Sequence, residues 1–247
     1  MSENTARHSY GYVQSNKQDM SLRTISLLSG FSYLLIFITG IYANFTALEP
    51  MISWEDPGLT YQVLSENTGT FKNAVWAFTG MLAFDSFLVW GLYRLFVHAS
   101  AKDSLAASIL RCINVVFFVV AWFSLTGVSD LLGQPVPGSE SPSMQVMALL
   151  NRFDSIWLAG LLFFGLHLLV LSRLVLKSPI VPRFIGILLA IAGIGYIIDS
   201  CAQWWLPNYA DFETVFSMVV IIPGVVGELS LTLFLLFFAK RFDRIKK

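Results

Sequence analysis

The chain has 247 residues, of which 55% are hydrophobic and 13% charged, and its mean hydropathy is +0.66. A soluble domain carries about 25% charged residues, so this composition excludes an ordinary soluble protein and indicates a polytopic membrane protein. The formal net charge is zero and no basic patch stands out, so we expect no nucleic-acid partner.

Six apolar windows are each long enough to cross a bilayer, since about 20 helical residues span the hydrocarbon core. They cover residues 24–46, 74–97, 105–128, 155–176, 183–205 and 215–238. Lipid offers no partner for an unpaired backbone group, so all six are expected to be helices. The sequence therefore predicts an all-α helical bundle with six transmembrane helices over residues 23–240, preceded by a tail of residues 1–22 and followed by a basic tail of residues 241–247.

The lysines and arginines predict the orientation of the bundle. Fourteen of the sixteen lie in the two tails and in the second and fourth connections, whereas the other connections are acidic. The positive-inside rule then places both termini in the cytoplasm. In this orientation an aromatic belt at the outer interface is expected from Trp76, Trp157, Trp204 and Trp205.

Two of the outer connections carry helix start signals. Asp56 and Pro57 form an N-cap and N1 pair for a short helix through Val63. Ser141 and Pro142 are expected to start a helix that continues into the fourth span. A continuous helix to residue 176 would be about 52 Å long, so it would project from the bilayer or bend at its surface.

Four ionisable residues lie well inside the spans: Asp85, His167, Asp199 and Glu228. A charge near the bilayer centre costs about 2.5–3.5 kcal/mol on insertion scales, so each is expected to face protein, water or a partner. Residue counting places all four at similar depth on different helices, which permits them to meet. The functional hypothesis is a ligand or proton site, and the alternative is a set of hydrogen bonds that only fixes helix packing.

The fifth and sixth spans carry the polar pattern around two of these acids. Tyr196, Asp199 and Gln203 are three and four residues apart and therefore share one face of a helix. Pro223 removes a helical hydrogen bond, which predicts a bend five residues before Glu228. Such a bend beside a buried acid is common along substrate pathways.

His167 is the only histidine inside a span, which argues against a bis-histidine haem. Pairing of His167 with Glu228 or Asp199 would lower the burial cost of both groups, and the alternative is a purely structural hydrogen bond. Asp85 could join them or pair with Arg111, although Arg111 is expected to extend toward the cytoplasmic interface instead. Metal-ligand spacings such as H-x-x-x-H and E-x-x-H do not occur among these residues, so we expect no metal and no other cofactor.

The stretches FGLHLLVLSRLVLKSPIVPRFIGILLAIAGIGYIIDS and PGVVGELSLTLFLL resemble the uncharacterised membrane family catalogued as domain of unknown function 4386. The first span, RTISLLSGFSYLLIFITGIYA, resembles the opening helix of that family, and the resemblance covers residues 22–240. The matching positions are His167, Pro182, Arg183, Gly186, Gly193, Tyr196, Asp199, Gly227 and Glu228. The resemblance implies six helices and a bacterial-type inner (plasma) membrane, and it supplies no activity, cofactor or substrate.

The leading hypothesis is binding of a small molecule or lipid, or proton-coupled transport, at a polar site between the fourth, fifth and sixth spans. The expected site residues are Glu228, Asp199, His167, Tyr196, Gln203 and Asp85. One alternative is a structural or accessory protein whose buried charges only pair helices, and another is an intramembrane enzyme that uses the carboxylates as acid and base. The expected partners are the bilayer and a small molecule, lipid or proton, and the sequence does not predict the oligomeric state.

Overall fold

The computed structural model describes residues 20–132 and 141–245, and all regular structure in these ranges is helical. Parts of the two predicted tails, residues 1–19 and 246–247, lie outside the described residues. The elements in chain order are α1 (Leu22–Ile41), the π-helix η1 (Tyr42–Leu48), the 3-10 helix η2 (Glu49–Met51), α2 (Pro57–Glu66), α3 (Thr68–Phe96), α4 (Ala101–Leu132), α5 (Pro142–Lys177), α6 (Arg183–Trp205), the 3-10 helix η3 (Tyr209–Asp211), α7 (Glu213–Phe237) and the 3-10 helix η4 (Ala239–Arg244).

Six helical segments in the described ranges are long and apolar enough to cross a membrane, and each overlaps one predicted window. They are Leu22–Met51, Thr68–Phe96, Ala101–Leu131, Pro142–Lys177, Arg183–Trp205 and Glu213–Phe237. The prediction of an all-α, six-helix membrane protein is confirmed. The placement of both termini in the cytoplasm stays a prediction.

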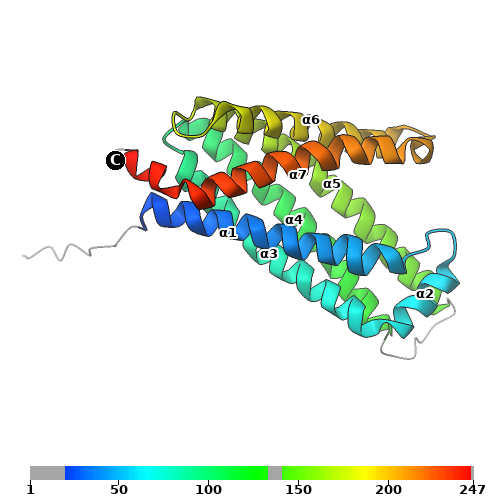
Figure 1. Ribbon diagram of the computed structural model, residues 1–247. Helices are drawn as coiled ribbons and strands as arrows, with labels where there is room; N and C mark the ends of the chain where they lie inside the picture. Colours follow the sequence, from blue (N-terminus) through cyan, green and yellow to red (C-terminus); the bar gives the residue numbers. More distant parts are fainter. Residues whose placement is uncertain (1–19, 133–140, 246–247) are drawn as a thin grey trace, which may run out of the picture.

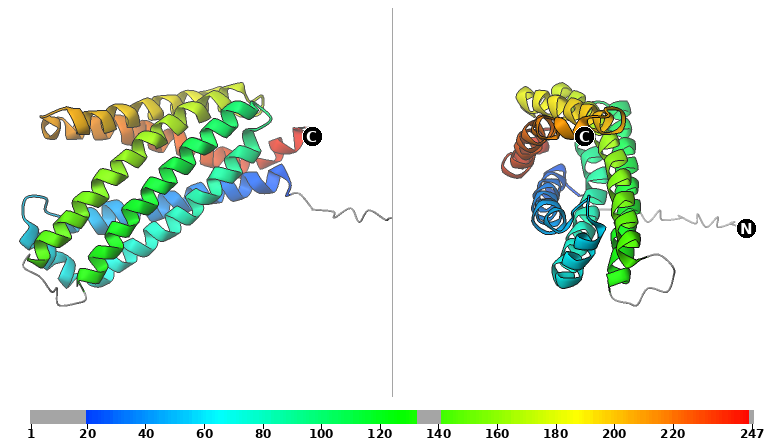
Figure 2. Two further views of the ribbon diagram at one scale, coloured as in Figure 1. Left: turned by 180° about the vertical axis from the view of Figure 1, so that it is seen from behind. Right: turned by 90° about the vertical axis from the view of Figure 1, so that its right-hand side faces the viewer.

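The membrane helices form a ring in chain order. Each of α3 to α7 packs on the helix before it, α1 packs on α3, and α7 returns to pack on α1 (Figure 1). Viewed from the end, α1 and α7 stand side by side, and α4 and α5 lie across from them (Figure 2). The ring has two ends, called here the η4 end, where α1 begins and α7 finishes, and the α2 end opposite.

The core of the ring consists of two apolar clusters. The cluster toward the η4 end draws buried residues from all six membrane segments, including Ile25 of α1, Leu189 of α6 and Leu231 of α7. The cluster toward the α2 end contains no described residue of α6 or α7. The α6–α7 hairpin therefore leaves the core partway along the bundle, and Ile36 of α1 packs against both clusters at that level.

Both helix starts predicted in the outer connections are present. The Asp56 carboxylate accepts a hydrogen bond from the backbone N–H of Leu59 at 2.9 Å, and Pro57 begins α2. Helix α5 begins at Pro142 and continues for 36 residues without interruption. At about 1.5 Å per residue it is about 54 Å long, well beyond the hydrocarbon core.

Helix α1 continues into the π-helix η1, which the apolar pattern of the sequence does not predict. Within the transition, the Asn44 side-chain amide donates to the backbone carbonyl of Gly40 at 3.0 Å. Short π segments are rare and occur often at functional sites. This one lies beside the cavity described below.

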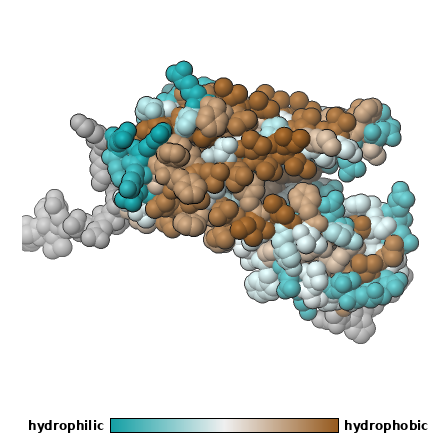
Figure 3. Space-filling model, viewed as in Figure 1, coloured by the Kyte–Doolittle hydropathy of each residue, from teal (hydrophilic) through white to brown (hydrophobic). Residues whose placement is uncertain are grey.

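Apolar side chains form a broad band over the face seen in Figure 3, with polar residues at both ends. Trp76 and Trp205 are 72% and 74% exposed, as residues of an aromatic belt would be. Trp157 is only partly exposed, and its indole stacks on Phe118 with ring centroids 3.7 Å apart, so its place in the belt stays a prediction. Rotation of α5 points this side chain toward α4.

Candidate functional site

An ion pair lies inside the bundle between Asp85 of α3 and Arg111 of α4. Asp85 is 4% exposed and Arg111 is 1% exposed. The expectation that Arg111 reaches for the cytoplasmic interface was wrong, and the pairing with Asp85 was the correct alternative. A carboxylate at the same level on the neighbouring helix supplies the counter-charge, so the long side chain stays inside.

Arg111 is also held by three side chains from other helices. One of its terminal nitrogens, Nη1, donates to the Tyr33 hydroxyl at 3.3 Å and lies 3.1 Å from Nε2 of His167. The guanidinium carbon lies 5.2 Å from the ring centre of Tyr33 and 5.6 Å from that of Phe164, which is favourable cation–π geometry. Helices α1, α3, α4 and α5 thus converge on one cation.

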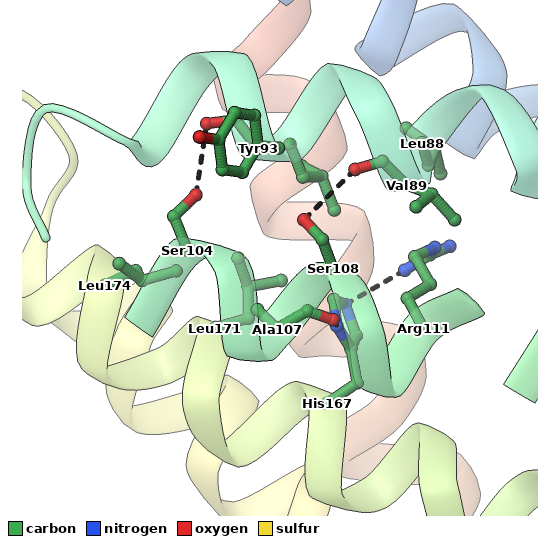
Figure 4. Close-up of a pocket in the computed structure, with 11 residues that line it drawn as sticks. Leu88, Val89, Tyr93, Ser104, Ala107, Ser108, Arg111, His167, Leu171 and Leu174 are labelled. Carbon is green, nitrogen blue, oxygen red and sulfur yellow. Dashed lines mark hydrogen bonds between the residues drawn. The ribbon is translucent and has the colours of Figure 1, made fainter. Parts of the chain in front are cut away.

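The contacts of His167 determine which ring nitrogen carries its proton. Arginine can only donate, so Nε2 of His167 accepts from Arg111 (Figure 4). The other ring nitrogen, Nδ1, then carries the proton and donates to the backbone carbonyl of Ala107 at 2.8 Å. His167 therefore orients Arg111 through a fully used imidazole.

The surroundings of His167 are tightly packed and leave no room for a water molecule. Figure 4 shows that, close to His167, two serines of α4 form hydrogen bonds to the backbone of α3. Ser104 donates to the backbone carbonyl of Tyr93 at 3.0 Å, and Ser108 donates to that of Val89 at 3.2 Å. This region is part of the scaffold behind Arg111 and is closed to a ligand.

Of the two alternatives for His167, the structure shows the structural hydrogen bonds: within the described residues, His167 forms no hydrogen bond or ion pair with Glu228 or Asp199. Similar depth along the membrane normal was the basis for considering such a pair. Depth does not determine which way a side chain points, and rotation of α5 directs His167 toward α4.

A cavity of about 220 Å³ lies where the α6–α7 hairpin leaves the core. All six membrane-spanning segments contribute to its wall. Its polar lining residues are Tyr33, Asn44, Asp85, Arg111, Tyr196 and Glu228. Its apolar and aromatic lining residues are Ile36, Phe37, Ile41, Phe45, Met81, Phe118, Trp157, Leu161, Phe164, Ile221 and Val225, and Gly40 completes the wall. The cavity thus combines a charged cluster with an extensive apolar surface.

Glu228 lines this cavity from α7 and is 9% exposed. In the described part of the chain, no hydrogen bond or ion pair reaches its carboxylate, although its backbone carbonyl accepts from the Thr232 hydroxyl at 2.8 Å. Gly224, one turn earlier, leaves room for Tyr196, whose hydroxyl would lie 3.4 Å from a Cβ at that position. Helix α7 is continuous through Pro223, and the bend expected there stays a prediction.

The cavity opens sideways between α1 and α7. Four of its lining residues are also exposed on the outer surface of the bundle, namely Ile41, Phe45, Ile221 and Val225. Figure 3 shows the surface hollowed between these helices toward the α2 end. At the η4 end the same helices touch, and the Ser26 hydroxyl donates to the backbone carbonyl of Leu235 at 2.8 Å. The mouth therefore lies on the apolar outer surface of the bundle, and the charged cluster lies deeper inside.

Asp199 belongs to a separate cluster that does not line the cavity. Its carboxylate accepts from the Tyr209 hydroxyl at 2.7 Å and from the Gln203 side-chain amide at 2.9 Å. Burial raises the pKa of Tyr209, and the hydrogen bond to Asp199 raises it further, so the hydroxyl stays protonated and donates. The cluster ties the end of α6 to the connection that leads into α7.

The predicted site residues therefore lie in three places. The cavity brings together Asp85, Tyr196 and Glu228, whereas His167 lies behind Arg111 and the pair Asp199 and Gln203 lies apart. A functional role for any of them stays a prediction. Across residues 20–132 and 141–245, no group of three or more His, Cys, Asp or Glu residues is arranged to hold a metal ion.

Three polar residues of the cavity were not among the predicted site residues: Tyr33, Asn44 and Arg111. A signal for Tyr33 was present in the sequence, because Ser26, Ser29 and Tyr33 recur at intervals of three and four residues and all three are buried. That spacing places them on one helix face, turned toward protein. For Arg111, only the position of its partner could have shown that it stays inside.

A family model described as "Domain of unknown function (DUF4386)" matches residues 28–239. An uncharacterized protein of Archaeoglobus fulgidus is 38% identical over 81 residues, which cover 30% of this chain and 50% of that protein. The chain thus spans about half the length of this curated relative. No solved structure matches the chain significantly. Neither the family model nor this relative has a described activity.

Proposed function

The chain belongs to this family of unknown function, DUF4386, and we propose that the protein binds a small amphiphilic molecule, such as a single-chain lipid, in the cavity between α1 and α7. The observation that carries the proposal is the shape of the cavity, which has an apolar mouth on the outer surface of the bundle and a charged cluster at its deep end. One water molecule needs about 10–15 Å³ of such space, so a cavity of about 220 Å³ has room for a much larger occupant.

The physical basis of binding inside a bilayer differs from that in water. Lipid tails are as apolar as the cavity wall, so moving an alkyl chain from the bilayer into the cavity yields little hydrophobic free energy. Preference for one ligand must therefore come from shape and from polar contacts at the deep end. Tyr33, Tyr196 and Glu228 supply such contacts, since they line the cavity with groups that can donate or accept hydrogen bonds.

The alternative of a purely structural role has support for some of the buried charges. Asp85 and Arg111 are paired with each other, and both oxygens of Asp199 accept hydrogen bonds. Glu228 differs, because within the described residues its carboxylate has no such partner. The proposal therefore assigns helix pairing to Asp85, Arg111 and Asp199, and ligand binding to Glu228.

A glycine in the cavity wall offers a direct test. A Cβ at Gly40 would meet only the Met81 sulfur, at 3.5 Å, which is ordinary contact. Gly40→Leu should therefore fill the cavity without a clash of backbones. Gly69→Leu is the matched control, because a Cβ at Gly69 meets nothing within 4 Å and Gly69 does not line the cavity.

The assay uses Trp157, which lines the cavity and should be quenched when a bromine-labelled fatty alcohol enters it. The protein is reconstituted into phosphatidylcholine nanodiscs, and a Trp157→Phe version of each variant gives the emission of the other tryptophans. We expect quenching of Trp157 in the wild type and in Gly69→Leu, and strongly reduced quenching in Gly40→Leu at unchanged thermal stability. Equal quenching in all three proteins, or none in the wild type, would overturn the proposal.

A further inference from the structure

We propose that the ligand of this cavity is a cationic amphiphile whose ammonium group pairs with Glu228 and whose alkyl chain extends toward the opening between α1 and α7. The inference rests on the proposed function and names its ligand class. It is carried by the charges of the deep end and by the arrangement of side chains along the cavity wall.

At the deep end of the cavity, the carboxylate of Glu228 has no cationic partner among the described residues. Arg111 and Asp85 neutralise each other as an ion pair. Glu228 lines the same cavity, is 9% exposed, and has no cation bonded to it among the residues that the structure describes. A buried carboxylate is costly unless it is paired, so the geometry favours a ligand that brings a positive charge to this point.

Aromatic side chains that line the same cavity suit a cation as well. Tyr33 and Phe164 already face Arg111, and Tyr196 lines the same cavity with its ring edge to face against that of Phe164, at 5.2 Å between centroids. Aromatic faces attract ammonium groups, and such rings beside an acid recur in sites that bind alkylammonium ligands. The tyrosine hydroxyls can also accept hydrogen bonds from an ammonium.

An anionic head group fits this end poorly. The guanidinium of Arg111 already binds Asp85, Tyr33 and His167, and only its Nε lacks a partner within the described ranges. An anion placed there would also face the carboxylate of Glu228, and like charges in a buried site repel strongly. Repulsion of anions would thus accompany attraction of cations.

Two helix faces run from the deep end toward the mouth of the cavity. On α7, Glu228, Val225 and Ile221 are three and four residues apart and line one side. On α1 and η1, the lining positions 33, 37, 40 and 44 follow the same spacing. Eleven helical residues extend about 16 Å, so the two faces form an extended slot suited to a single alkyl chain.

The test compares two probes that differ only in the head group, ω-bromododecylammonium and ω-bromododecanol. Binding is followed by quenching of Trp157 in phosphatidylcholine nanodiscs, after correction for the partition of each probe into discs without protein. In the wild type we expect the ammonium to bind about tenfold or more tightly than the alcohol, the usual scale for a buried charge pair. Glu228→Gln should abolish this preference.

Glu213→Gln is the matched control, since Glu213 lies on the same helix but is exposed and does not line the cavity. It should keep the full preference for the ammonium. Equal binding of both probes to the wild type would overturn the inference while leaving the proposed function standing. Failure of both probes to quench Trp157 would instead overturn the proposed function.

The comparison of probes on the wild type needs no folded variant, so the test holds even if Glu228→Gln does not fold. The ammonium could belong to a membrane lipid or to a free amine. Discs that contain phosphatidylethanolamine distinguish the two sources. If this lipid competes with ω-bromododecylammonium and weakens its quenching of Trp157, the ammonium belongs to a lipid head group. Full binding of the probe in those discs supports a free cationic amphiphile.

Discussion

Replacement of Asp85 by asparagine should destabilise the protein more than any comparable change at its surface. Asp85→Asn keeps the size of the side chain but removes the counter-charge of Arg111, which is 1% exposed. The guanidinium would then keep the Tyr33 hydroxyl at 3.3 Å and Nε2 of His167 at 3.1 Å as its hydrogen-bonding partners. Both are neutral acceptors at moderate distance.

The expected loss follows from the burial of the pair. Removing one partner of a buried ion pair costs about 3–5 kcal/mol, because the other charge stays behind unpaired. Hydrogen bonds between membrane helices contribute about 0.6 kcal/mol each on average, so the two remaining bonds of Arg111 offset little of this cost. We therefore expect Asp85→Asn to lower the free energy of unfolding by about 3 kcal/mol or more.

Asp103→Asn provides the matched control within the same chain. Asp103 pairs with Lys177 at 2.5 Å, but its side chain is 21% exposed and that of Lys177 is 45% exposed. Exposed ion pairs contribute about 0–1 kcal/mol, so this variant should be nearly as stable as the wild type. Both variants can be unfolded by titrating a denaturing detergent into mild micelles and followed by circular dichroism.

Equal stability of the two variants would refute this reasoning. Arg111→Met tests the pair from the other side, since it leaves the Asp85 carboxylate buried without its cation. The double variant should lose less stability than the two single losses combined, because neither charge is then left unpaired. Strict additivity would mean that the two residues are not energetically coupled.

Two further predictions concern α6. A methyl group on Gly193 would stand 2.8 Å from the backbone carbonyl oxygen of Gly165, so Gly193→Ala should separate α5 from α6 and cost about 1–3 kcal/mol in detergent unfolding, whereas Gly40→Ala should be tolerated. Burial and Asp199 raise the pKa of Tyr209 above its ordinary 10.0, so the stability due to its protonated hydroxyl is complete below about pH 10 and is lost as the pH rises through the folded-state pKa. Tyr209→Phe should be less stable at neutral pH and should lack that alkaline loss, which thermal unfolding over a pH series would reveal.

The features predicted correctly from the sequence are those with local causes. Membrane spans follow from the length of apolar windows, and all six are present. The start of α2 follows from Asp56 and Pro57, because a cap and a fixed backbone angle act within a few residues. The uninterrupted helix from Pro142 follows from the same kind of signal.

The features missed depend on how the helices rotate and pair. Asp199 and Glu228 lie on consecutive helices at similar counted depth. The Asp199 carboxylate nevertheless accepts a hydrogen bond from Tyr209, which lies in the connection after α6 and does not enter a count of depth within the helices. Arg111 stays inside because Asp85 faces it from α3. Trp157 stacks on Phe118 of α4. Each of these outcomes is decided by a partner outside the helix that carries the residue, and hydropathy contains no information about such partners.

The sideways mouth between α1 and α7 has a consequence for handling the purified protein. Detergents used for extraction are themselves amphiphiles with single alkyl chains, and they are present in large excess over the protein. A ligand that binds weakly would be displaced by mass action during purification, and the detergent would stabilise the folded protein in its place. Extraction into polymer-bounded native discs avoids this competition, so mass spectrometry of such samples should retain the natural occupant.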